Sequence, residues 1–378
     1  MVLIVKYIML SGGACVAIDV NTGEILALAS NPDYTPQTMY NGISNDLYNE
    51  WNTNKVWFNK AIQGTYQPGS TFKMVTAIAG LETGEITATE RINDTGIYKL
   101  GDDPQWWVKC WLYGDYGYGH GPLNVVGALE KSCNYFFNET GKRVGIERLS
   151  LYANHFGLGK KTGIELTGES AGMLATRESQ SAWGAGDTIR AAIGQSTNTF
   201  TPVQMAKYIA MIANGGNNID VSIIKSVMNS DGTVESKDAI EKYVTNELGL
   251  TNTSSESDDI VISQETFATV KEGMRRVTEG ESGTAKAVFT DFGVTVGGKT
   301  GSAETGRGEN ADVNAWFVGF APFDNPQIAV VVIIENGGHG FYTAEVAREI
   351  IAEYFGMNIN SNEIQENNQA IGYTETIQ

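Results

Sequence analysis

Basic residues are few relative to acidic ones in this chain of 378 residues. Lysine and arginine together number 26 against 44 aspartates and glutamates, which gives a formal net charge of -18. Nucleic acids and anionic membrane surfaces repel a protein with this charge. We therefore expect no nucleic-acid partner.

Long apolar runs are also missing. No stretch of 18 or more apolar residues occurs, so the sequence offers no candidate for a membrane span. The opening MVLIVKYIML is too short for a span and lacks a small-residue cleavage site. We expect residues 1–13 to be a trimmed or non-native segment, and the Asn- and Gln-rich residues 357–378 to be a mobile polar tail.

Cysteine is scarce as well, because the chain has only Cys15, Cys110 and Cys133. Three cysteines are too few for the disulfide framework that stabilises small secreted domains. The chain is long enough to do without one, since 378 residues bury a large apolar core.

The remaining sequence alternates strand-like and helix-like patterns. Strand patterns lie at both ends of the chain, at 14–30 and in three segments between 295 and 336, whereas helical apolar spacing dominates between them. We therefore predict an α+β fold over residues 14–356. Its sheet is built from the two ends of the chain and covered by helices, and a helical lobe is inserted at roughly 60–215.

The stretch YQPGSTFK (66–73) places Ser70 and Lys73 one helical turn apart, directly after a Pro-Gly turn. The apolar spacing that follows predicts a helix over 70–84. Side chains at i and i+3 share a helix face, roughly 5–6 Å apart at Cβ. The lysine amine then reaches the serine hydroxyl, as nucleophilic catalysis requires. Most such pairs are, however, only an N-cap serine beside a solvated lysine.

Two further short patterns follow in order. Ser132-Cys133-Asn134 lies at a predicted helix edge or loop. Lys299-Thr300-Gly301-Ser302 lies on a predicted strand among small residues, which let a ligand approach the backbone closely. Alone, the first pattern fits a helix cap and the second an edge-strand charge. The ordered set S-x-x-K, S-x-N and K-T-G-S is a strong signal.

The three motifs resemble those of the transpeptidase domain of class B, or monofunctional, penicillin-binding proteins. The likeness runs from about Gly12 to Phe355 and includes FGLGKKTGIE (156–165), GTA (283–285) and WFVGFAP (316–322). It implies a mainly antiparallel five-stranded sheet covered by helices, an all-helical lobe, and a site between them. Within the class, the chain looks most like the elongation-type enzymes or a sporulation relative from a Gram-positive lineage.

The resemblance assigns catalytic roles to the first two motifs. Ser70 Oγ attacks the carbonyl between the last two D-alanines of a peptidoglycan stem peptide, and neutral Lys73 accepts its proton. Ser132 relays the proton to the departing D-alanine. Asn134 holds the substrate amide and the Lys73 amine. An amine from a neighbouring stem then resolves the acyl-enzyme and leaves a cross-link.

The third motif is the substrate-binding strand by the same resemblance. Lys299, Thr300 and Ser302, with Gly301 between them, bind the terminal carboxylate of the peptide. The backbone N–H groups of Ser70 and Ser302 form the oxyanion hole. A β-lactam mimics the D-Ala-D-Ala end and traps Ser70 as a stable ester.

The resemblance also implies where such a protein works. Its expected partners are stem peptides ending in D-Ala-D-Ala, β-lactam antibiotics and a membrane glycosyltransferase. The catalytic domain is expected on the outer face of the cell membrane, held by a single N-terminal anchor that this chain lacks. The chemistry requires no cofactor.

Two cysteines and a histidine in or near the second motif are candidate metal ligands. Cys110, His120 and Cys133 lie near one another in the sequence, but no Cys-x-x-Cys pair gives them a standard zinc spacing. They form either part of a structural Zn²⁺ site that braces the Ser132 loop, or two reduced buried cysteines beside a loop histidine.

The fourth ligand of such a zinc site depends on the fold of residues 91–112. If this segment is a hairpin that turns at Asp102-Asp103, Asp94 pairs close to Cys110 and completes a Cys-His-Cys-Asp set. Asp115 is the alternative fourth ligand.

Two other functions are compatible with the same scaffold. A β-lactamase-type hydrolase needs a carboxylate and a bound water to deacylate Ser70, and no E-x-x-L-N-type segment lies between the second and third motifs. The other is a β-lactam-sensing or purely structural domain, and a sensor acylates without turnover. Turnover of a stem-peptide or thioester substrate separates a sensor from a transpeptidase.

Overall fold

The computed structural model describes residues 12–104, 107–249, 260–304, 313–338 and 340–357. Its centre is a sheet of five strands in the order β2-β1-β9-β8-β7, and every neighbouring pair is antiparallel. The predicted α+β fold, with a sheet from both chain ends, is therefore confirmed. The strands are β1 (Gly13–Asp19), β2 (Ile25–Asn31), β7 (Gly297–Glu304), β8 (Val313–Ala321) and β9 (Ile328–Ile334).

The expected N-terminal segment (1–13) and C-terminal tail (357–378) lie almost entirely outside the residues that the structure describes. Of residues 1–13 only Gly12 and Gly13 are described, and of residues 357–378 only Met357.

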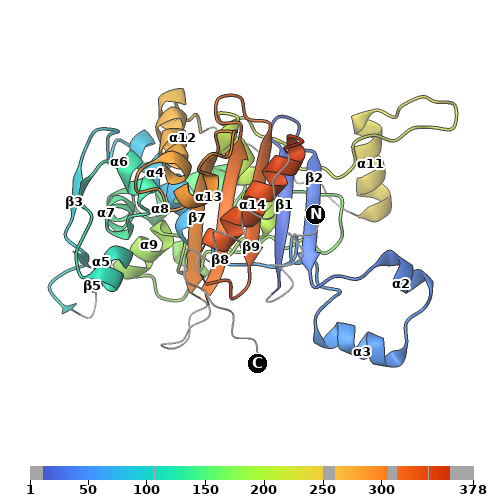
Figure 1. Ribbon diagram of the computed structural model, residues 1–378, viewed down its shortest axis with the longest axis horizontal. Coiled ribbons are helices and arrows are strands. Elements are labelled where there is room, and N and C mark those ends of the chain that lie inside the picture. Colours follow the sequence, from blue (N-terminus) through green and yellow to red (C-terminus); the bar gives the residue numbers. More distant parts are fainter. Residues whose placement is uncertain (1–11, 105–106, 250–259, 305–312, 339, 358–378) are drawn as a thin grey trace.

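Helices cover both faces of the sheet, because its central strands β1, β8 and β9 are apolar except near their ends. In β1, Ala14, Val16 and Ile18 belong to one core, whereas Cys15 and Ala17 belong to a second core on the opposite face. Each fully buried valine or isoleucine stabilises the fold by roughly 1.5–3 kcal/mol. The first face packs against α10 (Pro202–Ala213), and the second against α14 (Phe341–Tyr354) and α13 (Lys286–Phe289) (Figure 1).

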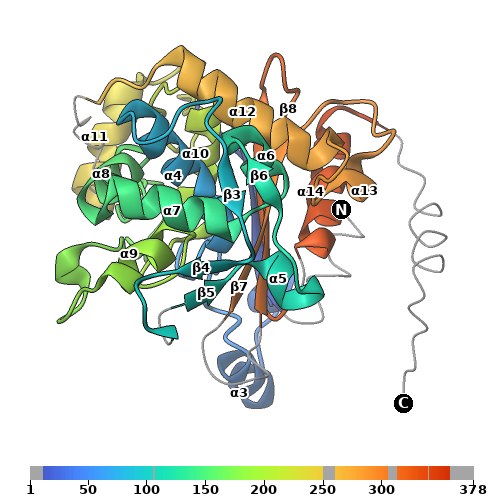
Figure 2. The ribbon, with the colours of Figure 1, turned by 90° about the vertical axis from the view of Figure 1, so that its left-hand side faces the viewer.

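The helical lobe lies on the β7 side of the sheet, opposite β2 (Figures 1 and 2). The long helix α12 (Gln264–Glu279) contacts both β7 and the lobe and so joins the two parts. The lobe contains the 3-10 turn η1 (Gly69–Phe72), α4 (Lys73–Glu82), α6 (Val125–Glu130), α7 (Asn134–Val144), α8 (Ile146–His155), the 3-10 turn η3 (Arg177–Ser179) and α9 (Ala185–Ala192).

Two small antiparallel pairs and a short helix complete the lobe. The predicted hairpin in 91–112 forms between β4 (Ile97–Lys99) and β5 (Trp107–Lys109). The strand before it, β3 (Ile92–Asp94), pairs instead with β6 (Gly121–Leu123). Helix α5 (Trp111–Tyr116) follows β5.

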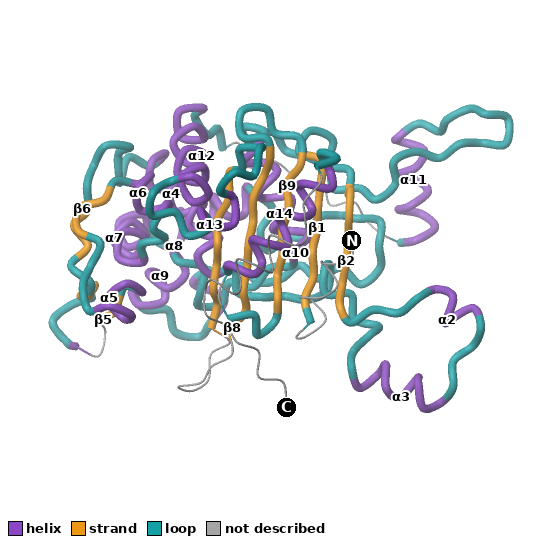
Figure 3. Tube along the Cα trace, viewed as in Figure 1, coloured by secondary structure: helices purple, strands orange, loops and turns teal. Residues whose placement is uncertain are grey.

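Two segments project from the body on the side of β2 (Figure 3). One carries α2 (Pro36–Tyr40) and α3 (Asn45–Thr53), and the other carries α11 (Lys237–Leu248). Within the described ranges, none of the helices combines the length and the apolar composition of a membrane span.

Candidate active site

Ser70 lies on the 3-10 turn that precedes α4, and its side chain is half-buried. The turn is locked in place by Gly69, which has a φ of 53° and donates its N–H to the carbonyl of Gly194 at 2.9 Å. A Cβ on Gly69 would lie 2.7 Å from the carbonyl oxygen of Ser302. Only glycine therefore lets the Ser70 turn pack directly against β7.

Lys73 begins α4 and is fully buried. Its Nζ donates to Ser132 O at 2.8 Å, to Ser132 Oγ at 3.2 Å and to Asn134 Oδ1 at 2.6 Å. Among the described residues no hydrogen bond joins Lys73 to Ser70, and these three acceptors use all the donors of the amine in its charged form. The first and second motifs meet through Lys73.

The second motif sits at a break in the helical pattern of residues 123–145. Helix α6 ends at Glu130 and α7 begins at Asn134. Between them Ser132 has a φ of 52°, which is strained for a residue with a side chain. Cys133 is the N-cap of α7, and its Sγ accepts from Phe136 N–H. The break turns both Ser132 and Asn134 toward Lys73.

The third motif reaches the same point from the sheet. Lys299 is fully buried on β7, and its Nζ donates to Ser132 Oγ at 2.9 Å and to the Thr300 carbonyl at 2.9 Å. The Ser132 hydroxyl therefore lies between the amines of Lys73 and Lys299. All three motifs, which are widely separated in the sequence, converge on this hydroxyl.

The rest of the third motif lines the edge of β7. A Cβ on Gly301 would lie 2.9 Å from Thr71 Cγ2, so this glycine lets the strand pack against the Ser70 turn. Ser302 is exposed. The hydroxyls of Thr300 and Thr284 are 2.6 Å apart. The motifs assign no role to Thr284, although it lies in the GTA segment (283–285) that contributes to the family resemblance.

Burial shapes the electrostatics of both lysines. It lowers the pKa of Lys73 to about 8, although the charges of Cys133 and Cys110 act in the opposite direction. Burial, together with the neighbouring charge of Lys73, holds the pKa of Lys299 well below its usual value. A neutral amine, which accepts a proton, is therefore accessible at this site near physiological pH.

Four candidate metal ligands form a compact cluster beside the second motif. One ligand atom from each of Asp94, Cys110, His120 and Cys133 lies within 4.8 Å of all the others. Asp94 Oδ2 is 2.6 Å from His120 Nδ1 and 3.3 Å from Cys133 Sγ, and Cys110 Sγ is 3.6 Å from His120 Nδ1. The structure thus brings the predicted four residues together.

Asp94 lies in the cluster because of a strand pairing that differs from the predicted one. The hairpin pairs Cys110 N–H with the Gly96 carbonyl, two residues beyond Asp94. The β3–β6 pairing sets Asp94 opposite Gly121 and so beside His120. The alternative ligand Asp115 lies exposed on α5 and is not a member of the cluster.

Metal ligands bind in their deprotonated forms, and the pKa shifts in the cluster favour these forms for some of its residues but not for all. A hydrogen bond with Cys133 is the main reason that the pKa of Cys110 falls to about 5, whereas burial raises the pKa of Cys133 well above its usual value. Burial opposes ionisation of Asp94, but hydrogen bonds from His120 and Gly96 outweigh it and lower the Asp94 pKa. Zinc would therefore have to displace one thiol proton.

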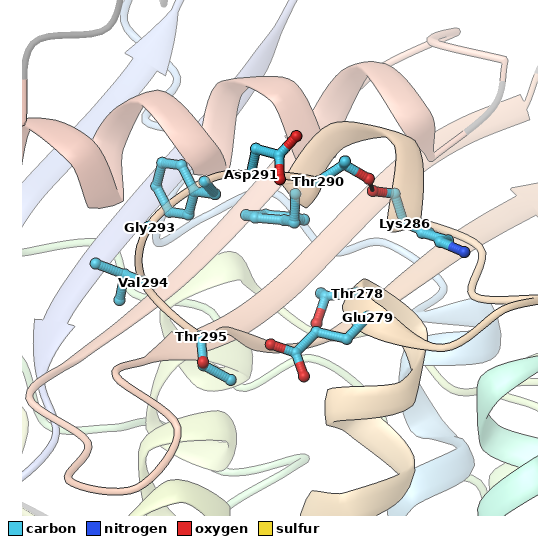
Figure 4. Close-up of a pocket in the computed structure, with 10 residues that line it drawn as sticks. Thr278, Glu279, Lys286, Thr290, Asp291, Gly293, Val294 and Thr295 are labelled. Carbon is cyan, nitrogen blue, oxygen red and sulfur yellow. Dashed lines mark hydrogen bonds between the residues drawn. The ribbon is translucent and has the colours of Figure 1, made fainter.

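A pocket of about 370 Å³ lies on the other side of β7, between α12, α13 and the chain that enters β7 (Figure 4). Thr278, Glu279, Lys286 and Asp291 supply its polar groups. It contains no residue of the three motifs, so it is separate from the candidate active site.

The family described as "Penicillin binding protein transpeptidase domain" matches residues 13–354. Together with the five-stranded sheet and the three converging motifs, this match shows that the chain belongs to the penicillin-binding protein transpeptidase domain family, in its class B branch.

Similar proteins include the peptidoglycan D,D-transpeptidase MrdA of Acinetobacter baumannii, 31% identical over 95% of this chain and 53% of that protein. Stage V sporulation protein D of Bacillus subtilis is 32% identical over 86% of this chain and 45% of its own length. The chain thus spans about half the length of the curated relatives it matches. The expected Gram-positive lineage is not supported, because most of these relatives are Gram-negative MrdA proteins.

Solved structures show the same fold. Pseudomonas aeruginosa PBP2, crystallised with WCK 5153, has a TM-score of 0.78 and is 31% identical over 93% of this chain and 75% of that one. Penicillin-binding protein A of M. tuberculosis, in a ceftriaxone acyl-enzyme complex, has a TM-score of 0.71 and is 27% identical over 90% of this chain and 73% of that one.

Proposed function

We propose that the protein is a peptidoglycan D,D-transpeptidase that cross-links stem peptides through an acyl-enzyme on Ser70. The observation that carries this proposal is the Ser132 hydroxyl, held between two buried lysine amines beside the Ser70 turn. Residues 14–356 form the transpeptidase domain in this proposal. The D,D-transpeptidase name of the MrdA relatives supports it.

Lys73 and Ser132 move the proton in the acylation step. Neutral Lys73 accepts the proton of Ser70 Oγ as this oxygen bonds to the carbonyl carbon between two D-alanines. The C–N bond then breaks, and Ser132 passes the proton to the departing D-alanine amine. Asn134, which accepts a hydrogen bond from Lys73, orients the lysine. The N–H groups of Ser70 and Ser302 stabilise the negative oxygen.

Lys299, Thr300, Gly301 and Ser302 bind the terminal carboxylate of the peptide in this proposal. An arriving carboxylate favours a positive Lys299, because opposite charges stabilise each other in a buried site. A charged Lys299 in turn favours the neutral form of Lys73, which shares the Ser132 hydroxyl with it. Substrate binding thereby prepares the base.

Covalent inhibition by β-lactams belongs to the same proposal, and the acyl-enzyme of the M. tuberculosis relative supports it. The proposal keeps both the elongation-type role and the sporulation role, and the similarity to stage V sporulation protein D of Bacillus subtilis supports the second. The proposed partner is a membrane glycosyltransferase, and a similar chain, 29% identical, was solved in a peptidoglycan synthase complex. In this proposal the catalytic domain acts on the outer face of the cell membrane, where its peptidoglycan substrate lies.

The decisive experiment combines labelling with turnover. After mixing with a fluorescent penicillin, the intact mass of the protein should rise by one molecule of the drug. A thioester ending in D-alanine should be consumed faster with a D-amino acid acceptor than without one. Labelling without consumption would identify a sensor, and equal consumption with and without the acceptor would identify a hydrolase.

We also propose that Asp94, Cys110, His120 and Cys133 hold a structural Zn²⁺. Separations of 3.3–3.6 Å between donor atoms suit a tetrahedral site with metal–ligand bonds of about 2.0–2.3 Å. The direct hydrogen bond between Asp94 and His120 would have to lengthen. Such a site ties β3 and α5 to the N-terminus of α7, and its binding free energy adds to folding stability.

Removal of this zinc should lower both stability and reactivity. Protein purified without added metal should contain about one zinc per chain. A strong chelator should lower the melting temperature and slow penicillin labelling, and Cys110→Ser should do so without chelator. Cys15→Ser is the matched control, since Cys15 is also a free buried thiol but belongs to the second core. Zinc-free protein with unchanged melting would contradict the proposal.

A further inference from the structure

A largely buried ion pair lies beside the first motif, although none of the three motifs contains its two residues. Glu335 directly follows β9, and its carboxylate accepts two hydrogen bonds. Lys60 Nζ donates to Oε2 at 2.6 Å, and the hydroxyl of Tyr66 donates to Oε1 at 2.7 Å. Tyr66 precedes Ser70 by four residues. The end of the sheet is thus bonded to the segment that carries the nucleophile.

Two glycines leave the space that these contacts need. Gly12 has a φ of 87°, and a Cβ there would lie 2.7 Å from Glu335 Oε2 and 3.3 Å from Lys60 Nζ. A Cβ on Gly64 would lie 2.6 Å from the hydroxyl oxygen of Tyr66. The backbone also fixes the carboxylate, because Glu335 N–H donates to the Gly12 carbonyl at 3.0 Å. A larger residue at either glycine would therefore force one of the three polar groups to move.

The charges make the two hydrogen bonds strong. Both involve an ionised group, and such bonds are roughly twice as strong as neutral ones. The side chain of Lys60 is 8% exposed and that of Glu335 is 26% exposed, so solvent competes little for either. Burial and the hydrogen bond to Glu335 raise the pKa of Tyr66 above its usual value, so the hydroxyl keeps its proton and remains a donor. Lys60 thus holds the acceptor, and the acceptor holds Tyr66.

The chain after Tyr66 is fixed by contacts with the sheet and the lobe. The backbone of Tyr66 exchanges two hydrogen bonds with that of Phe200, at 3.0 and 2.9 Å. The Tyr66 ring meets the ring of Trp316 edge-on, with centroids 6.0 Å apart. Trp316 Nε1 in turn donates to the Gln67 carbonyl at 2.9 Å. A shift of the Tyr66 side chain would therefore disturb the main chain that leads to Ser70.

Trp316 also borders the strand of the third motif. It lies on β8 directly opposite Gly301 of β7. The turn at Gly69 packs so closely on the same strand that a Cβ would lie 2.7 Å from the Ser302 carbonyl oxygen. The two N–H groups proposed for the oxyanion hole, those of Ser70 and Ser302, thus belong to segments that Trp316 joins. A displacement of about 1 Å at a reacting group costs about 10²-fold in rate.

We propose that Glu335 is a positioning residue for Ser70, which acts through the hydroxyl of Tyr66 and takes no part in the bond changes. Its carboxylate, held by Lys60, keeps the tyrosine against Trp316 and so fixes the place of Ser70 Oγ relative to β7. The inference rests on the proposed acylation of Ser70. Loss of the Tyr66–Glu335 hydrogen bond should slow the chemical step of acylation and leave drug binding unchanged.

Stopped-flow labelling over a range of fluorescent penicillin concentrations separates the Kd of the non-covalent complex from the acylation rate constant k2. Tyr66→Phe keeps the ring but removes the donor, and k2 should fall about tenfold at an unchanged Kd, as one charge-assisted hydrogen bond allows. Glu335→Ala should lower k2 at least as much. Glu335→Gln should recover most of k2, because its amide oxygen still accepts from Tyr66. The double variant Tyr66→Phe/Glu335→Ala should be no slower than Glu335→Ala, since both changes remove the same contact.

Tyr98→Phe is the matched control. Tyr98 also donates its hydroxyl to a glutamate, Glu139, at 2.8 Å, and its ring also meets another ring edge-on, that of Tyr135. It should keep the wild-type k2. A contact that only stabilised the fold would lower the melting temperature of Tyr66→Phe without changing k2. A wild-type k2 in Tyr66→Phe, or an equal loss in Tyr98→Phe, would overturn the inference. Wild-type protein that does not label would instead refute the proposed function.

Discussion

Replacing Ser70 by alanine is expected to abolish covalent labelling by a fluorescent penicillin. The acylation rate should fall on the order of 10³-fold or more, because the variant has no nucleophile at the turn beside Ser302. The fold should persist, since the change removes one oxygen from a half-buried side chain. In-gel fluorescence and intact mass measure the loss, and thermal melting checks the fold.

Ser150→Ala, which removes a hydroxyl on α8, is the matched control and should label normally. A Ser70→Ala variant that labels as fast as the wild type would show that the nucleophile lies elsewhere. Peptide mapping of the adduct would then identify it.

Replacing Lys73 by methionine should lower the acylation rate by about 10²- to 10⁴-fold, the usual contribution of a general base. Methionine has a similar length, so it fills the buried volume but cannot accept a proton. Lys299 still donates to Ser132 Oγ in this variant, which keeps the Ser132 hydroxyl positioned. Lys73→Arg should be equally slow, since arginine remains charged. Lys142→Met, on the exposed face of α7, is the control.

The pH profile gives an independent test of the same base. Burial lowers the Lys73 pKa to about 8, and only the neutral amine accepts a proton. The wild-type labelling rate should therefore rise with pH and level off above about pH 8. A rate that stays constant from pH 6 to pH 9, measured with a stable fold throughout, would exclude Lys73 as the base.

Much of the fold follows from local patterns. The segments 314–322 and 327–336 predict β8 and β9, because each holds a continuous apolar run with polar residues only at its ends, as strands buried on both faces do. The Pro-Gly turn before Ser70 and the small residues around Lys299 likewise mark the places where backbones pack closely. Local sequence therefore locates the motifs on their elements.

The hydrogen-bond partners in the site depend on contacts between distant segments, which local patterns do not specify. Spacing along a helix predicts that Lys73 reaches Ser70, whereas the amine donates instead to Ser132, in the break between α6 and α7, and to Asn134 at the start of α7. The strained backbone of Ser132 has no sequence signature, since glycine is the usual residue at such a φ. The hairpin predicts that Asp94 lies near Cys110, but the structure brings Asp94 there through the pairing of β3 with β6.

The pairing of β1 with β9 has a consequence for how the domain is made. Gly13 pairs with Ile334, so these strand partners are separated by roughly 320 positions along the sequence, and contacts over such separations form slowly. During synthesis β1 can pair only with β2, and this hairpin exposes the apolar residues of β1 until α10, α14 and β9 have emerged. Folding of the sheet is therefore completed only after almost the whole domain has been synthesised. Until then the nascent chain is prone to aggregate, and a chain that stops before β9 leaves its first strand unpaired on one side.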